Sequence, residues 1–110
     1  MPKTQHDSLE LVHELRRRLG QQYGDRLVQL VLFGSQARGD ATVESDVDVL
    51  VVLRGDVPHP GLEIDAMMDI IYDLTLRYEQ TLSVLPVSEK DFRARQSPLL
   101  INIRREGVCL

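Results

Sequence analysis

Two apolar runs joined by a short polar segment constrain the fold of this chain more than any other feature. The first run, residues 28–33, is rich in β-forming residues and stops abruptly at Gly34. The second run, residues 47–53, is mostly valine and leucine, with Asp48 near its start. Runs of this length and composition predict buried strands. We expect the polar residues 40–44 to let the second strand return beside the first.

The end of the first strand has the features of a phosphate-binding bend. Gly34 can adopt a positive φ and lets a ligand approach the backbone closely. Ser35 stands where a following helix would begin, so its hydroxyl can cap that helix or bond a phosphate. Free backbone N–H groups at such a helix start favour an anion. A Gly-Ser pair alone more often marks an ordinary turn, so the prediction also needs support from the second strand.

The second strand begins with two carboxylates, Asp46 and Asp48. Residues two apart on a strand share a face and lie about 6.6–6.8 Å apart along the chain. Two carboxylates on one face of a buried strand repel each other unless one is protonated or a cation bridges them. Mg²⁺ takes oxygen ligands and usually binds through one or two carboxylates together with substrate phosphates. The pair therefore predicts a metal site, although Asp46 alone would more often be a strand-start or capping residue.

The combined pattern resembles the minimal nucleotidyltransferase domain of the DNA polymerase β-like superfamily. The matching residues are Gly34-Ser35-x-x-Arg38-Gly39, followed by Ser45-Asp46-x-Asp48. The resemblance covers nearly the whole chain and implies one α/β (α+β) domain over residues 1–110, a small mixed β-sheet with flanking helices. It implies binding of ATP or another nucleoside triphosphate with Mg²⁺, and transfer of a nucleotidyl group to a hydroxyl.

The resemblance also assigns roles to five residues. Asp46 and Asp48 become the catalytic, metal-binding carboxylates, and Gly34, Ser35 and Arg38 hold and position the phosphates.

One position departs from the family pattern. Active members usually have a third carboxylate on a third strand, which we expect at residues 82–87, and the aligned position here is Ser83. Serine carries no charge, and loss of a proton acceptor typically costs a factor of about 10²–10⁴ in rate.

Two functions of different class stay open at this point. Many stand-alone domains of this kind are encoded beside a small helical HEPN-type partner and resemble antitoxins, some of which adenylylate the partner on tyrosine. The first function is therefore an enzyme that adenylylates its toxin partner. The second is a binding module with weak or no catalysis, which neutralises the partner by forming a complex; Ser83 favours this alternative. A homo- or hetero-oligomer is compatible with either function.

Composition excludes several other classes. The 110 residues predict one domain, and the net charge of −4 with a pI near 5.3 disfavours a broad basic face for duplex nucleic acid. We find no apolar run of membrane-spanning length and no apolar N-terminal leader. Cys109, the single cysteine, cannot form an internal disulfide, which favours a reducing, cytoplasmic location. The three histidines have no metal-ligand spacing, so we do not expect His59 to be catalytic.

Helical periodicity predicts two long helices. The first, over residues 8–20, has a capping box at Asp7 and Glu10 and a stop at Gly20. Its expected apolar stripe is Leu9, Val12, Leu15 (or Arg16) and Leu19. The second helix, over residues 62–80, has the apolar stripe Ile64, Met67 or Met68, Ile71, Leu74 and Tyr78. Its other side carries three aspartates at four-residue spacing, the acidic ladder Asp65, Asp69 and Asp73. We interpret the ladder in the first place as a solvated face, and in the second place as a surface that binds a partner.

The C-terminal third predicts an edge strand and two short helices. Pro86 favours an edge position for strand 82–87. Ser88 and Ser97 are expected to cap helices over residues 89–95 and from Pro98 to Gly107, after which the chain packs back or adds a strand. The cluster of Arg93, Arg95, Arg104 and Arg105 can bind a nucleotide phosphate, contact an acidic partner, or pair with the acidic helix; the last is the simplest interpretation.

Overall fold

The computed structural model describes residues 5–34 and 46–110. The elements follow in the order α1 (Gln5–Tyr23), the 3-10 turn η1 (Gly24–Arg26), β1 (Leu27–Phe33), β2 (Val47–Leu53), α3 (Pro60–Tyr78), β3 (Leu82–Ser88), α4 (Glu89–Ala94), α5 (Pro98–Glu106) and β4 (Val108–Cys109). Both apolar runs around the Gly34 bend are strands, as predicted.

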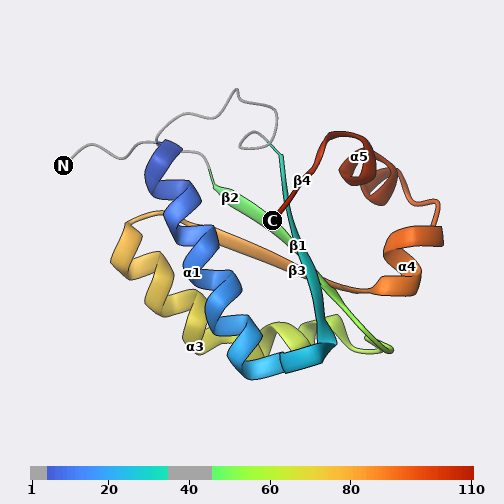
Figure 1. Ribbon diagram of the computed structural model, residues 1–110, viewed down its shortest axis with the longest axis horizontal. Helices are drawn as coiled ribbons and strands as arrows, with labels where there is room; N and C mark the ends of the chain where they lie inside the picture. The colour runs from blue at the N-terminus through green and yellow to red at the C-terminus, as the bar shows by residue number, and fades with distance from the viewer. Residues whose placement is uncertain (1–4, 35–45) are drawn as a thin grey trace.

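The strands form one mixed sheet in the order β3-β2-β1-β4 (Figure 1). Strand β1 pairs antiparallel with both β2 and β4, and β2 pairs in parallel with β3. The predicted small mixed sheet with flanking helices is therefore confirmed, as is the edge position of the strand that contains Pro86. The C-terminus adds a strand: β4 lies beside β1, and the Leu110 N–H donates to the Leu30 carbonyl at 2.8 Å.

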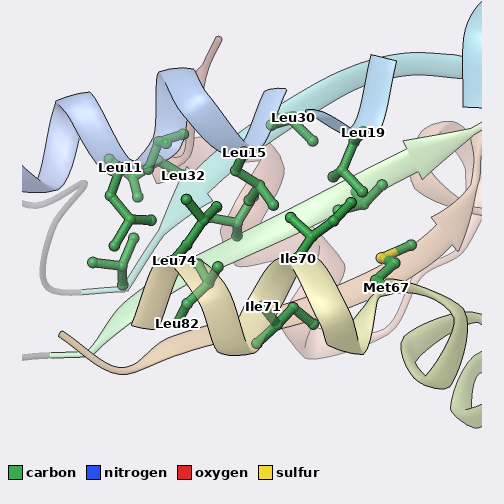
Figure 2. Packing of buried hydrophobic residues seen from close by; sticks show 14 of the residues in the cluster. Leu11, Leu15, Leu19, Leu30, Leu32, Met67, Ile70, Ile71, Leu74 and Leu82 are labelled. Carbon is green, nitrogen blue, oxygen red and sulfur yellow. The ribbon is translucent and has the colours of Figure 1, made fainter. Parts of the chain in front are cut away.

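Helices cover both faces of the sheet because the side chains of its central strands alternate between two cores. The larger core lies between the sheet and the pair α1 and α3 (Figure 2). Every second residue of β2 points into it: Val47, Val49, Val51 and Leu53. On the opposite face, Leu50 and Val52 pack with Leu100 and Ile103 of α5. Asp48 belongs to this second face, since it lies two residues before Leu50 on the same strand.

Helix α1 corrects three predictions. It begins at Gln5 and continues to Tyr23, so Asp7 lies inside the helix and is not its cap, and Gly20 does not end it. Leu9 is 41% exposed, whereas Leu11 takes the buried position. A glycine inside a helix costs only about 1 kcal/mol relative to alanine, and burial of one apolar face outweighs it. The buried residues of that face are Ser8, Leu11, Val12, Leu15 and Leu19.

Helix α3 agrees with its predicted periodicity. Met67, Ile71 and Leu74 are buried, and Met67 rather than Met68 takes the fully buried position. Ile64 and Tyr78 are partly buried against the same core. The helix ends at Glu79, whose left-handed φ of 51° closes the last turn while its N–H donates to the Thr75 carbonyl.

The C-terminal helices are capped as predicted, but their arginines pair differently. Ser88 accepts from the Asp91 N–H at 3.1 Å, and Ser97 accepts from the Leu100 N–H at 3.2 Å. The arginine cluster was expected to pair with the acidic helix, and this prediction is wrong. Arg93 and Arg95 pair with Glu89 and Asp91 one turn earlier, and Arg104 donates to the Phe92 and Arg95 carbonyls. The bonds from Arg104 join α5 to the end of α4, and both helices lie on the same side of the sheet (Figure 1).

Among the residues that the structure describes, no helix combines the length and apolar character needed to cross a membrane.

Candidate functional site

The candidate site begins where β1 ends in the Gly34 bend. Gly34 has a φ of +73°, the left-handed conformation that was expected there. A Cβ atom added at this position would lie 2.6 Å from the Oδ2 atom of Asp48. The backbone of the bend therefore lies directly against the carboxylate of the neighbouring strand. Glycine suits this position, because any other residue would strain the dihedral angle and displace the Asp48 side chain.

Strand pairing brings Asp48 and Ser83 together with the end of β1 at one end of the sheet. Asp48 pairs with Phe33, the last residue of β1, on one side and with Ser83 of β3 on the other. Ser83 therefore lies beside the strand that contains Asp48, as expected, while its alignment with a catalytic carboxylate stays a prediction. Asp46 is exposed and directly precedes β2, so of the two carboxylates only Asp48 lies on the strand itself.

The electrostatics of the site disfavour two free carboxylates. Burial raises the pKa of Asp48 above its ordinary value, and the negative charge of Asp46 raises the pKa further. Each cause penalises the charged form of Asp48. A bound cation would remove the repulsion between the carboxylates, so the oxygen donors of Asp46 and Asp48 fit a hard divalent ion.

Ser83 is the residue of β3 that lies directly beside Asp48. Its side chain is exposed and lies in parallel register with Asp48, on the same face of the sheet. Within residues 5–34 and 46–110, no group of three histidine, cysteine or acidic residues could hold a metal ion. Asp46 and Asp48 are the described acidic residues at the start of β2, and the side chain that lies beside Asp48 on β3 is a serine.

A hollow of about 210 Å³ adjoins the bend. Phe33 and Gly34 form one wall, and α5 forms the other with Leu99, Asn102, Ile103 and Glu106. The polar side chains Asn102 and Glu106 were not predicted to be near the site. No local signal indicates them, since some seventy residues of chain separate α5 from Gly34. They lie there because α5 packs on the Asp48 face of the sheet and β4 returns beside β1.

The remaining predicted residues are not brought into this site by the described structure. Ser35 and Arg38 lie outside the described residues, as do Gly39 and Ser45. His59 precedes α3 and is exposed. His59 follows the end of β2 at Leu53, and Leu53 lies five residues, about 16 Å, along the strand from Asp48.

Known proteins are similar to this chain at the level of sequence. The family model described as nucleotidyltransferase domain matches residues 12–106. The candidate protein adenylyltransferase MJ0604 of Methanocaldococcus jannaschii is 36% identical over 84 residues, which cover 76% of this chain and 77% of that protein. The candidate protein adenylyltransferase MJ1305 of the same organism is 33% identical over 97 residues, covering 84% of this chain and 64% of that protein.

Solved structures share the fold at lower identity. A candidate nucleotidyltransferase from Sulfolobus solfataricus superposes with a TM-score of 0.62 at 20% identity, over 96% of this chain and 80% of that one. A toxin-antitoxin structure with AMP-PNP gives a TM-score of 0.60 at 17% identity, and the match covers 87% of this chain and 69% of that one. A variant of the MntA-HpeT toxin-antitoxin gives a TM-score of 0.59 at 18% identity, and the match covers 89% of this chain and 70% of that one. At these identities the likeness concerns the fold.

Proposed function

This chain belongs to the nucleotidyltransferase domain family, and on that premise we propose that it binds ATP or another nucleoside triphosphate with Mg²⁺ and serves as the antitoxin of a helical HEPN-type toxin. The observation that supports the nucleotide part is that the Asp48 carboxylate occupies the space that a side chain at Gly34 would need. The partner part is supported by two relatives named as protein adenylyltransferases and by structural neighbours named as toxin-antitoxin complexes.

In this proposal each half of the motif has its own task. Asp46 and Asp48 would hold Mg²⁺, which when bound supplies charge neutralisation at the phosphates. The Gly34 backbone and Ser35 would hold the phosphates, and Arg38 would position them. The hollow beside Gly34 is smaller than the roughly 300–1,000 Å³ of a typical ligand pocket, so it suits part of a nucleotide and not all of it.

The reaction would be transfer of an adenylyl group to a hydroxyl of the partner. The hydroxyl oxygen bonds to the α-phosphorus, the bond from that phosphorus to the bridging oxygen breaks, and pyrophosphate leaves. The hydroxyl proton needs an acceptor, and Ser83 is a weak one. We therefore expect a slow enzyme, or one whose partner supplies the base.

A second candidate function follows from the same serine. With Ser83 beside Asp48, the chain would neutralise its partner by forming a complex, with nucleotide bound but little or no transfer.

Label transfer distinguishes the two functions. The full chain is incubated with ATP labelled at the α-phosphate, Mg²⁺ and the helical protein encoded beside it, in parallel with the double variant Asp46→Asn/Asp48→Asn. The enzyme predicts label on the partner with wild type and at least a hundredfold less with the variant. Equal labelling by both would refute the assignment of the aspartates.

Protection in cells provides the complementary measurement. If the double variant still binds the toxin and restores growth, complex formation alone suffices and the second function holds. If the variant binds but no longer protects, catalysis is required. Calorimetry with ATP and Mg²⁺ checks nucleotide binding independently of either outcome.

A further inference from the structure

Helix α3 has a second stripe of side chains, on the face that points away from the sheet. Its members are Leu62, Asp65, Asp69, Tyr72 and Leu76, which follow one another at intervals of three, four, three and four residues. This is the spacing by which one helix packs along another. The three large apolar members are 64%, 62% and 77% exposed for Leu62, Tyr72 and Leu76. We name these five residues the outer stripe.

The outer stripe is distinct from the faces of α3 that already have partners. The inner face packs into the core, and the flank toward α1 is bonded to that helix. There, Arg18 pairs with Asp73, and Gln22 donates to the Ala66 carbonyl at 3.0 Å. Of the acidic ladder, therefore, only Asp73 is used within the described chain. Asp65 and Asp69 are exposed and have no ion pair among the described residues.

We propose that the outer stripe docks one helix of a different protein, with apolar side chains at the two ends of the contact and lysine or arginine in the middle. The apolar ends of the stripe supply area to be buried, and its acidic centre selects the charge of the partner. This inference deepens the proposed function by naming the surface that holds the protein partner, and for its biological role it rests on that function.

A second copy of this chain is a poor occupant of the outer stripe. In an antiparallel pair centred on Asp69, Leu62 would meet Leu76 of the other copy, but Asp69 would face Asp69. In a parallel pair, each aspartate would face its own equivalent. Like charges directly opposite each other are unfavourable, and the chain already has a net charge of −4. The stripe therefore favours a cationic partner over itself.

The position of the outer stripe separates docking from nucleotide binding. Helix α3 packs on the sheet face formed by Val47, Val49 and Val51, whereas Asp48 lies on the opposite face with α5. A helix bound along α3 would leave the Gly34 bend open. A complex held there is compatible with a bound nucleotide.

Two synthetic helical peptides test the surface without any assumption about function. Both carry leucine at the ends of one face; one has lysine at its two central positions, and the other has glutamate. We expect the full chain to bind the lysine peptide at least tenfold more tightly than the glutamate peptide by fluorescence anisotropy. The variants Tyr72→Gln/Leu76→Gln, which removes apolar area without changing charge, and Asp65→Lys/Asp69→Lys should lose this binding, and the second should prefer the glutamate peptide. Equal binding of both peptides, or binding unchanged in both variants, overturns the proposal.

Matched controls keep folding and charge effects apart. Leu9→Gln changes an exposed leucine of α1, and Asp25→Lys/Asp56→Lys makes the same charge change outside the outer stripe. Both should bind the lysine peptide like wild type, and circular dichroism verifies that every variant is folded. The protein encoded beside this chain is then added: if wild type does not bind it, the proposed function fails, whereas a complex that survives both α3 variants refutes only the docking surface.

Discussion

At the scale of single residues, the site depends on how closely the Gly34 backbone approaches Asp48. The position needs both a left-handed φ and the space of the missing side chain. Gly20 offers a comparison within the same chain, since it lies inside α1 with nothing within 4 Å of an added Cβ. The two glycines therefore predict opposite results when replaced by alanine.

Gly34→Ala should lower the free energy of unfolding by about 1–2 kcal/mol from the left-handed φ alone, and should weaken ATP binding because the Asp48 side chain must move. Gly20→Ala should raise the free energy of unfolding by up to about 1 kcal/mol, because alanine is the better helix former. Urea denaturation and calorimetry measure both effects. A Gly34→Ala protein that binds ATP like wild type would contradict the site geometry.

The raised pKa of Asp48 predicts how stability depends on pH. The folded chain holds this proton more tightly than the unfolded chain, so stability falls as the pH rises above the ordinary value of 3.8 toward the folded pKa. Asp48→Asn removes that penalty. Without divalent metal at pH 7 its Tm should therefore exceed that of wild type, and the difference should vanish below the ordinary pKa.

The control is Asp56→Asn, an exposed aspartate outside the site. Added Mg²⁺ should raise the Tm of wild type more than that of Asp48→Asn. A Tm difference that persists unchanged into acid would show that charge is not its cause.

At the scale of elements, the pairing of β2 with β3 sets which side chain lies beside Asp48. The parallel register places Ser83 beside Asp48, and this strand is held at the sheet edge by β2 alone among the described strands. A carboxylate at this position would lie on the same face as Asp48. Ser83 is therefore the position at which the need for a proton acceptor, part of the proposed function, can be tested.

Ser83→Asp should increase adenylyl transfer to the partner by about 10²-fold or more, the usual contribution of a positioned base. Ser83→Asn has nearly the same shape without the charge, and should leave the rate unchanged. Transfer of labelled AMP measures both. If the aspartate variant is no faster while it still binds ATP and Mg²⁺, the missing carboxylate is not what limits the rate.

At the scale of the whole molecule, stability comes from the core between the sheet and the helices α1 and α3 (Figure 2). Helix α3 contributes to it with its inner face only. Leu74 is fully buried there, whereas Leu76, two residues later, is 77% exposed in the outer stripe. The two leucines separate the role of α3 in folding from its proposed role in docking.

Leu74→Ala should lower the free energy of unfolding by about 2–5 kcal/mol, a large share of the roughly 5–15 kcal/mol typical of a domain. Leu76→Ala should change it by no more than about 0.5 kcal/mol. Chemical denaturation of both variants measures the contrast. Similar losses in the two would mean that the outer stripe is also part of the folded core.

The sequence by itself determined the strands on either side of the bend, the glycine at the bend and the aspartates beyond it. These features are local: apolar runs, a residue without a side chain, and carboxylates two positions apart. It also determined which side chains of α3 face the core, because helical periodicity can be recognised within a single element. The roles of Ser35 and Arg38, and the extent of the domain over residues 1–110, stay predictions.

Only the tertiary structure decided the length of α1, the burial of Leu11 in place of Leu9, and the partners of the C-terminal arginines. It alone also placed Asn102 and Glu106 beside Gly34. In the acidic ladder, it paired Asp73 with Arg18 and left Asp65 and Asp69 in the outer stripe. Apart from the one-turn pairs of Arg93 and Arg95, these outcomes depend on contacts between segments far apart in the chain. The physical reason is that burial against a distant element outweighs local preferences of about 1 kcal/mol.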